Sequence, residues 1–276
     1  MNFYNWKNRE QINEDSISLF TSIGMAQTLN LKNSYKIGSE LPPCWHWLYF
    51  LDRPMSSELE KDGHRKKGKF MPPIDLPRRM YAGGKINFYS AIKIGEKVIK
   101  KSNVINIEEK KGKSGKLVFV KVKHEIFRNK DLLLDEIQDI VYRPITNQNK
   151  LSMPVCENPK QDFSQEIIFN PVTLFRYSAL TFNSHRIHYD FPYATKAEGY
   201  PGLIVHGPLL ATFLANFSTE EFLDMQLSSF QFRSKSPCFA DTKVYIEGLK
   251  LSSEEIELWI RDEKNIVVMT AKAKYK

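Results

Sequence analysis

The segment at residues 208–217 constrains the fold most, because it predicts a helix that is apolar nearly all the way round. Its large side chains and the small ones between them are Leu209, Leu210, Ala211, Thr212, Phe213, Leu214, Ala215 and Phe217. A helix without a polar face has to be buried. Because several strand-like segments follow it, the simplest arrangement is a long sheet that curls around this helix.

Strand patterns in both halves of the chain predict an α+β protein with two antiparallel sheets. Residues 81–143 form alternating runs separated by short polar breaks, and four further strands are expected at about 226–236, 242–252, 254–262 and 265–275. In the first half, Ile17, Phe20 and Ile23 predict an amphipathic helix over residues 13–29, and an irregular, aromatic-rich segment follows at 39–70.

A connector rich in proline and asparagine at residues 142–159 divides the chain into two expected domains. The N-terminal domain would span residues 1–150 and the C-terminal domain residues 160–276. Each half reads in the same order, as helix, irregular segment and then several long strands. This order indicates a duplicated architecture, although a repeat at the level of single residues is too weak to demonstrate.

Composition excludes several classes of protein. The net charge of +8 favours anionic partners, but the basic runs at 64–69 and 110–116 are interpreted as solvated loops, and no nucleic-acid signature accompanies them. Cys44, Cys156 and Cys238 lack metal or disulfide spacing, so no metal site is expected and a reducing compartment is favoured. No signal segment and no membrane span are recognised, which predicts a cytoplasmic protein.

Polar groups suited to catalysis gather just before the apolar helix. An amide and two histidines, Asn183, His185 and His188, lie within six residues, and His206-Gly207-Pro208 begins the helix. A histidine with an ordinary pKa near 6.5 suits acid–base work at neutral pH. The unpaired N–H groups at a helix N-terminus favour negative charge.

These residues resemble the signature of the MaoC-like hydratases, which have an Asp and a His five residues apart before the helix of a hot-dog fold. The runs TFNSHRIHYD and GLIVHGPLLA are most similar to a two-domain branch, the type 2 3-hydroxyacyl-thioester dehydratases and the mesaconyl-C4-CoA and itaconyl-CoA hydratases. The resemblance implies a double hot dog, in which an antiparallel sheet wraps a central helix in each half. It also implies that the N-terminal half is a degenerate hot dog that widens the acyl pocket. Since that half has no Asn/Asp-x4-His pattern near Trp45-His46-Trp47, it is interpreted as catalytically silent.

The resemblance assigns tasks to the residues of the motif. His188 would exchange protons, while Asn183, at the position of the wider family's acid, would hold the water; the alternative for Asn183 is a turn that satisfies its own backbone. The Gly207 N–H would stabilise the enolate. Further substrate contacts are assigned to His185, His206, Pro208, Arg176 and Arg186, although surface ion pairs explain the arginines equally well. Asp190 is read as a helix N-cap.

The predicted function is that of a hydro-lyase, which adds water to an α,β-unsaturated thioester or removes it from the 3-hydroxyacyl form. The resemblance favours a branched or dicarboxylyl C4–C5 acyl-CoA, with acyl carrier protein as the other possible carrier. No cofactor is expected, since coenzyme A is part of the substrate, and a homodimer is compatible with the sequence. Two alternatives stay open, an acyl-CoA thioesterase and a non-catalytic thioester-binding subunit.

Overall fold

The computed structural model describes residues 3–112, 115–144, 154–155 and 160–276. Most of the predicted connector, and with it the domain boundary near 150–160, lies outside the described residues. The division into two domains at that point therefore stays a prediction. Within the described residues, no helix is long and apolar enough to cross a membrane.

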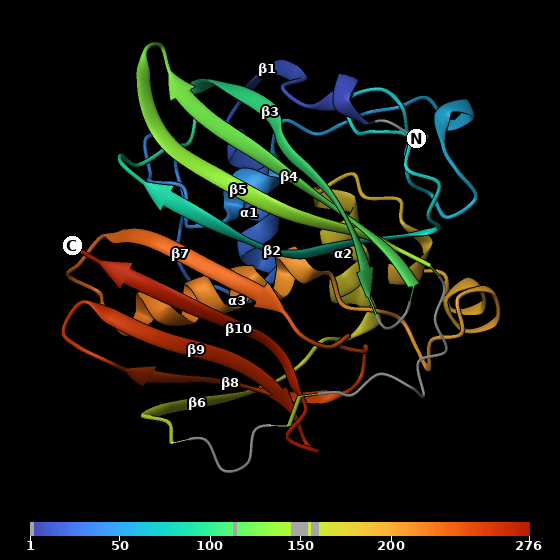
Figure 1. Ribbon diagram of the computed structural model, residues 1–276. Coiled ribbons are helices and arrows are strands. Elements are labelled where there is room, and N and C mark those ends of the chain that lie inside the picture. The colour runs from blue at the N-terminus through green and yellow to red at the C-terminus, as the bar shows by residue number, and fades with distance from the viewer. Residues whose placement is uncertain (1–2, 113–114, 145–153, 156–159) are drawn as a thin grey trace.

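Ten strands among the described residues form one antiparallel sheet that runs through both halves of the chain (Figure 1). The strands of its first half are β1 (Glu10–Ser16), β2 (Arg78–Phe88), β3 (Lys97–Gly112), β4 (Gly115–Arg128) and β5 (Asp131–Arg143). Those of its second half are β6 (Phe163–Ile168), β7 (Leu227–Ser234), β8 (Lys243–Lys250), β9 (Glu255–Asp262) and β10 (Val267–Tyr275). The four predicted C-terminal strands are confirmed within a few residues at each end.

The strand order shows that the architecture is duplicated. The first half follows the order β1-β3-β4-β5-β2 and the second, read from its outer edge, the order β6-β8-β9-β10-β7. The two central strands, β2 and β7, pair antiparallel and place Ile86 opposite Phe230. Both side chains are fully buried. The predicted α+β double hot-dog fold is confirmed, with the two halves sharing one continuous sheet.

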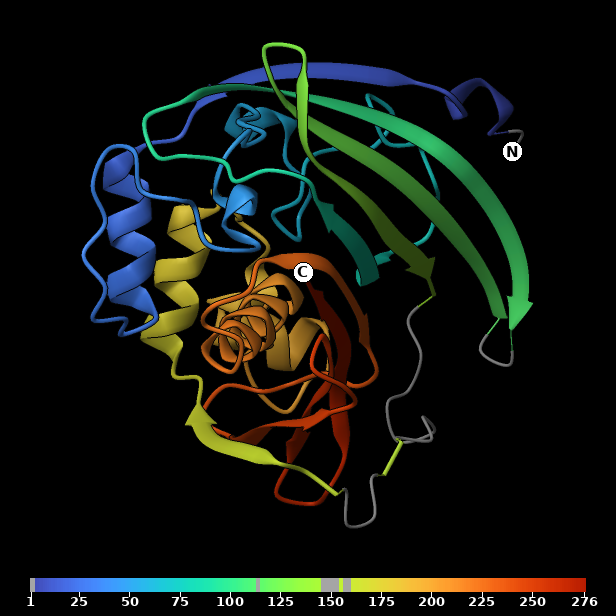
Figure 2. The same cartoon turned by 90° about the vertical axis from the view of Figure 1, so that its left-hand side faces the viewer.

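The second half wraps around the predicted apolar helix, α3 (Gly207–Glu220), which Figure 2 shows nearly end-on within the curve of the sheet. Leu209, Leu210 and Leu214 are buried on this helix, and apolar residues of the facing strands, such as Ile246 and Ile260, are fully buried as well. Because the helix has no polar face, it is stable only where the sheet covers it.

In the first half, the only α-helix among the described residues is α1 (Leu19–Thr28), and it packs beside α2 (Pro171–Leu180) of the second half (Figure 2). The expected helix over residues 13–29 is wrong in its first turn, because residues 13–16 belong to β1 and Ser18 caps the helix by accepting the Thr21 N–H. Its expected buried face is also wrong. Phe20 is 84% exposed, whereas Met25 and Ala26 are buried.

In chain order, the irregular segment after α1 in the first half corresponds to α3 in the second half. It contains two short 3-10 helices, Trp45–Leu48 and Ser56–Glu58. The aromatic cluster expected to cover apolar groups does so, since Trp45 and Tyr49 are buried in the main core. The first half of the sheet is thus lined by a loop instead of a long helix.

Candidate active site

A cavity of about 1040 Å³ lies where the two halves of the sheet meet. Its walls come from the 3-10 helix Arg186–His188, the first turn of α3, strand β2, the inner face of β3 to β5, and the irregular segment of the first half. Six of the predicted site residues line it together, namely Asn183, His185, His188, His206, Gly207 and Pro208.

His188 is buried in the wall of this cavity with one ring nitrogen engaged. Its Nδ1–H donates to the Ile204 carbonyl at 2.7 Å, which leaves Nε2 as a free acceptor. Burial, reinforced by the nearby His64, lowers the pKa of His188 to about 4, against the opposing effect of the Ile204 hydrogen bond. The imidazole is therefore neutral at pH 7 and suited to accept a proton.

Asn183 forms a turn in addition to lining the cavity. It follows Phe182, which has a positive φ of 48°, and its Oδ1 accepts the His185 N–H at 3.0 Å. The turn anticipated as the alternative role is therefore present. Since the oxygen is engaged with the backbone, the Nδ2 amide is the group of Asn183 that is left to donate to a bound water.

The first turn of α3 offers a backbone donor to the same cavity. His206 is the N-cap residue, and the Gly207 N–H has no hydrogen-bond partner among the described residues. Pro208 has no N–H. A Cβ added to Gly207 would meet the Ser234 Oγ at 3.8 Å and the Tyr81 carbonyl oxygen at 3.9 Å, which are ordinary van der Waals contacts. Such an amide suits a developing oxyanion.

Four imidazole rings form a row along the cavity wall. Their centroids are 3.9 Å apart between His64 and His185, 5.3 Å between His185 and His188, and 3.7 Å between His188 and His206. Burial is the main cause that lowers the pKa of each ring, to about 4 for His64 and well below the ordinary value for His206. At the far end of the row, the His206 Nε2 and the Ser178 Oγ are 2.8 Å apart.

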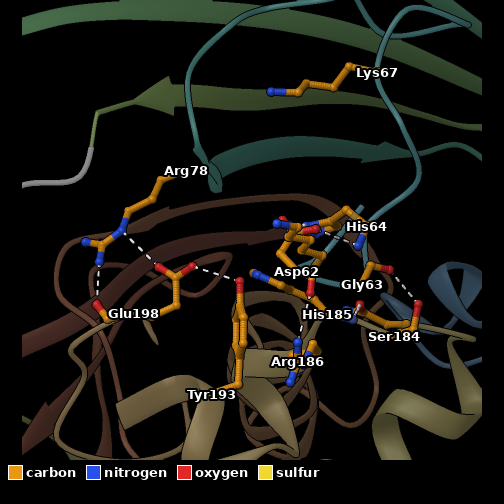
Figure 3. A network of polar contacts seen from close by, with 12 residues as sticks. Asp62, Gly63, His64, Lys67, Arg78, Ser184, His185, Arg186, Tyr193 and Glu198 are labelled. Carbon is orange, nitrogen blue, oxygen red and sulfur yellow. Dashed lines mark hydrogen bonds and ion pairs between the residues drawn. The ribbon is translucent and has the colours of Figure 1, made fainter. Parts of the chain in front are cut away.

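The first ring of this row belongs to the N-terminal half, which was predicted to be catalytically silent. His64 Nδ1 donates to the Asp62 carboxylate at 2.9 Å, and both residues line the cavity (Figure 3). Burial raises the pKa of Asp62, but the hydrogen bonds and charge of His64, together with the charge of His185, outweigh it and lower this pKa well below its ordinary value, so the carboxylate is ionised. The first half therefore brings an aspartate and a histidine to the candidate site.

Backbone contacts fix this segment of the first half against the motif of the second (Figure 3). Ser184 Oγ donates to the Gly63 carbonyl at 2.6 Å, and the Arg186 N–H donates to the Asp62 carbonyl at 2.8 Å. Gly63 has φ of +90°, and a Cβ there would lie 1.8 Å from the Ser184 carbonyl oxygen. Only glycine permits this approach.

The two predicted substrate-binding arginines do not line the cavity. Arg176 is exposed on α2. Arg186 donates to the Asp190 carboxylate at 2.7 Å and to the Lys61 carbonyl at 3.1 Å, with its guanidinium over the Tyr193 ring. The alternative explanation for the two arginines, a surface ion pair, is thus correct for Arg186. Asp190 accepts the Tyr193 N–H at 3.0 Å, in agreement with its predicted capping role.

Sequence reasoning missed Asp62 and His64, because His64 begins the basic run at 64–69 that was interpreted as a solvated loop. The side chain of His64 is only 18% exposed. Asp62-Gly63-His64 was nevertheless a visible signal, since a glycine between an acid and a histidine marks a sharp backbone turn beside two reactive groups. Ligand atoms of Asp62, His64 and His185 lie within 4.8 Å of one another, a geometry compatible with a metal ion.

A second polar group lines the inner face of the first half of the sheet. The fully buried Glu136 carboxylate accepts hydrogen bonds from His46, Trp47, Tyr81 and Gln138 at 2.6 to 3.2 Å. Burial raises the pKa of Glu136, but the hydrogen bonds and charges of its neighbours, His46 foremost, lower it to about 2. An ionised carboxylate is therefore held in the cavity wall, with its lone pairs satisfied.

The fold places the chain among double hot-dog proteins. A Mycobacterium tuberculosis protein whose structure is described as a double hotdog fold matches with a TM-score of 0.61 and 10% identity, over 98% of this chain and 96% of its own. At that identity the likeness speaks for the fold alone. Fold and cavity together place the chain in the class of double hot-dog proteins, with histidines and a helix N-terminus in the cavity wall.

Sequence comparison identifies the family. The family described as "Hydroxyacyl-thioester dehydratase type 2" matches residues 44–240. A "Mesaconyl-C(4)-CoA hydratase" of Chloroflexus aurantiacus is 43% identical over 85% of this chain and 84% of its own length. A mitochondrial "Hydroxyacyl-thioester dehydratase type 2" of Schizosaccharomyces pombe is 29% identical over 80% and 81%. The chain belongs to the hydroxyacyl-thioester dehydratase type 2 family, and the predicted hydro-lyase activity on acyl thioesters is confirmed.

Proposed function

We propose that this hydro-lyase adds water to a short, branched α,β-unsaturated acyl-CoA that carries a second carboxylate, such as mesaconyl-C4-CoA or itaconyl-CoA. The observation that carries the proposal is the charge of the cavity that holds His188 and Gly207. Six lysines and arginines line it against four aspartates and glutamates, so the cavity favours an anionic ligand. The similarity to a relative named for mesaconyl-C4-CoA agrees with this.

Cations without an acidic partner carry the specificity part of the proposal. Arg65 and Arg78 pair with acidic side chains. The other four cavity cations, Arg79, Lys100, Arg143 and Lys235, form no ion pair with a described residue. Arg79 lies close enough to His64 and His185 to lower the pKa of both. These free cations take over the role that the sequence assigned to Arg176 and Arg186.

Lys100 is a half-buried member of this group, and its environment favours a bound anion. Its Nζ lies 4.9 Å from the centre of the Phe50 ring. Burial is the main cause that lowers the pKa of Lys100, although Glu136 and Asp15 act in the opposite direction. A substrate carboxylate beside this ammonium group would relieve the cost of its burial, because an enclosed charge is stable only when it is paired.

The chemistry follows from the two groups that meet in the cavity. A water held by the Asn183 Nδ2 and the His188 Nε2 attacks the β-carbon, while the thioester oxygen accepts the Gly207 N–H. The helix N-terminus stabilises the enolate that forms, because its unpaired amides point at the developing charge. Water is added across the double bond, and no redox change takes place.

Loss of the enoyl-thioester absorbance measures this activity, with crotonyl-, mesaconyl-C4- and itaconyl-CoA as substrates. We expect kcat/KM to be at least tenfold higher for a dicarboxylyl-CoA than for crotonyl-CoA, since one charged contact contributes about 1.5–3 kcal/mol. Lys100→Met should reduce this preference and leave crotonyl-CoA turnover within about threefold. Equal kcat/KM values for all three substrates would count against the dicarboxylyl part, and thiol release without hydration would indicate a thioesterase.

A further inference from the structure

Two histidines of the cavity, His64 and His188, present the same ring nitrogen but differ in what holds the other one. Nδ1–H of His188 donates to the Ile204 carbonyl, whereas Nδ1–H of His64 donates to the Asp62 carboxylate. In both rings Nε2 has no hydrogen-bond partner among the described residues. The site therefore holds two candidate bases, and they differ in how well each can hold a positive charge.

A buried imidazolium is costly unless an opposite charge lies beside it. A neutral carbonyl behind His188 offers only a dipole, while the carboxylate of Asp62 offers a full negative charge at hydrogen-bonding distance. Asn183 cannot substitute for this carboxylate, because an amide does not exchange a proton and its oxygen is engaged with the His185 N–H. An imidazolium at His64 would therefore have a carboxylate at hydrogen-bonding distance, which an imidazolium at His188 would lack.

The position of His64 is fixed as firmly as that of the motif itself. Gly63 and Ser184 hold the two segments together through a 2.6 Å hydrogen bond, and the backbones approach too closely for any side chain at position 63. His185 lies between His64 and His188 in the row of rings. These contacts thus hold Asp62 and His64 in a fixed position in the cavity wall.

We propose that His64, held by Asp62, is a second catalytic residue of this site, a role that rests on the proposed hydration. As the new C–O bond forms at the β-carbon, an O–H bond of the water breaks and its proton moves to the His64 Nε2. The electron pair of the double bond moves onto the thioester oxygen. The His64 imidazolium then returns the proton to the α-carbon, and the carbonyl is restored.

In this assignment His188 holds the attacking water through Nε2, and Asp62 is a positioning residue that acts through His64. The charged and titratable groups that face His64 are Asp62 and Lys67 of its own segment, Arg79 of β2, and His185 and His188 of the motif. Asp62 raises the pKa of His64, while Arg79 and Lys67 lower it. Removal of the Asp62 charge should therefore move the acidic limb of the kcat/KM profile to lower pH.

The test compares full-length Asp62→Asn, His64→Gln and their double variant with the wild type, using mesaconyl-C4-CoA. Glu60→Gln is the matched control, since Glu60 is an exposed carboxylate on the same segment outside the cavity. Each single variant should lower kcat about 100-fold, the usual contribution of a positioned acid–base group. The double variant should be no slower than the slower single variant, because the two residues act as one unit. Glu60→Gln should match the wild type.

Each other outcome has a definite meaning. Variants that keep more than a third of the wild-type kcat, or that lose activity only because their melting temperature falls below the assay temperature, would overturn the role of the pair. Loss of wild-type activity in EDTA, with recovery in Zn²⁺, would overturn it as well, because the same atoms would then be metal ligands. If the wild-type chain hydrates none of the three thioesters, the proposed function itself is wrong, and not only the role of Asp62 and His64.

Discussion

The two halves of the sheet share one topology but line their inner faces differently. In the second half the inner face is apolar and covered by α3, with residues such as Ile246, Ile260 and Leu214 fully buried. In the first half the inner face carries Glu136 and Lys100, and the segment over it forms no long helix. One half is thus a packed core, and the other is the wall of a cavity.

This difference shows how a duplicated fold makes room for a ligand. A helix packed in the curve of the sheet excludes water and stabilises the second half through burial of apolar surface. Where the long helix is absent, the same curve leaves space, and the polar groups that face it must satisfy one another. The N-terminal half is degenerate as a hot dog, yet it provides Asp62, His64 and most of the free cations of the site.

The largest effect is expected where the second half meets the cavity. His188→Gln should lower kcat by about 10²–10⁴-fold, because it removes the imidazole nitrogen that holds the water. Its melting temperature should fall by only a few degrees, since the glutamine can still donate to Ile204. Steady-state hydration kinetics and thermal unfolding check the two parts. A variant with more than a tenth of the wild-type kcat would remove His188 from the proposed mechanism.

A smaller but still severe effect is expected where the two halves are joined. Gly63→Ala places a methyl group on the Ser184 carbonyl, so the free energy of unfolding should fall by about 3 kcal/mol or more. Hydration should slow as well, because Asp62 and His64 are displaced from the motif. Urea denaturation and the hydration assay provide the two measurements.

Gly38→Ala is the matched control for this junction. Gly38 has a similar positive φ of 85°, but nothing lies within 4 Å of its missing Cβ. Its substitution should therefore lower the free energy of unfolding by only about 1 kcal/mol, the cost of placing an L-residue at positive φ. Equal losses in the two variants would mean that the contact between Gly63 and Ser184 does not hold the halves together.

The buried carboxylate on the inner face of the first half should make the free energy of unfolding depend on pH. The pKa of Glu136 is about 2 in the folded protein against an ordinary 4.5, so the unfolded chain takes up the proton first. The stability that this carboxylate contributes is present above pH 4.5 and is lost as pH falls toward 2. The loss amounts to about 3 kcal/mol.

Glu136→Gln removes this pH-dependent contribution. At pH 7 the variant should be about 2 kcal/mol less stable, since an amide cannot accept all four donors. The difference from the wild type should shrink as the pH falls from 4.5 to 2, as measured by urea denaturation at several pH values. A difference that stays constant would show that Glu136 is not ionised in the folded protein. Glu247→Gln provides the comparison on the second half, where an arginine pairs with the buried carboxylate.

Much of the fold was predictable because it depends on local patterns. An apolar stretch after Gly207-Pro208 can only be a buried helix, and the alternation in the last 50 residues or so has the period of strands. The first helix was misplaced because residues 13–16 pair with β3 through contacts that no local pattern reveals. Its exposed Phe20 likewise depends on which side faces α2.

The sequence by itself determined the motif, since Asn183, His185 and His188 are close along the chain. Gly207 lies beside them because Ile204 contacts Ile187 and His188 through hydrogen bonds. Tertiary structure alone decided which groups join them. Gly63 and Ser184 are 121 residues apart, and their contact, together with that between Arg186 and Asp62, brings Asp62 and His64 to the site. It also decided that Arg186 pairs with Asp190 while Lys100 faces the cavity. The residue type determines the charge of a side chain, but the packing of the two halves determines which group that charge contacts.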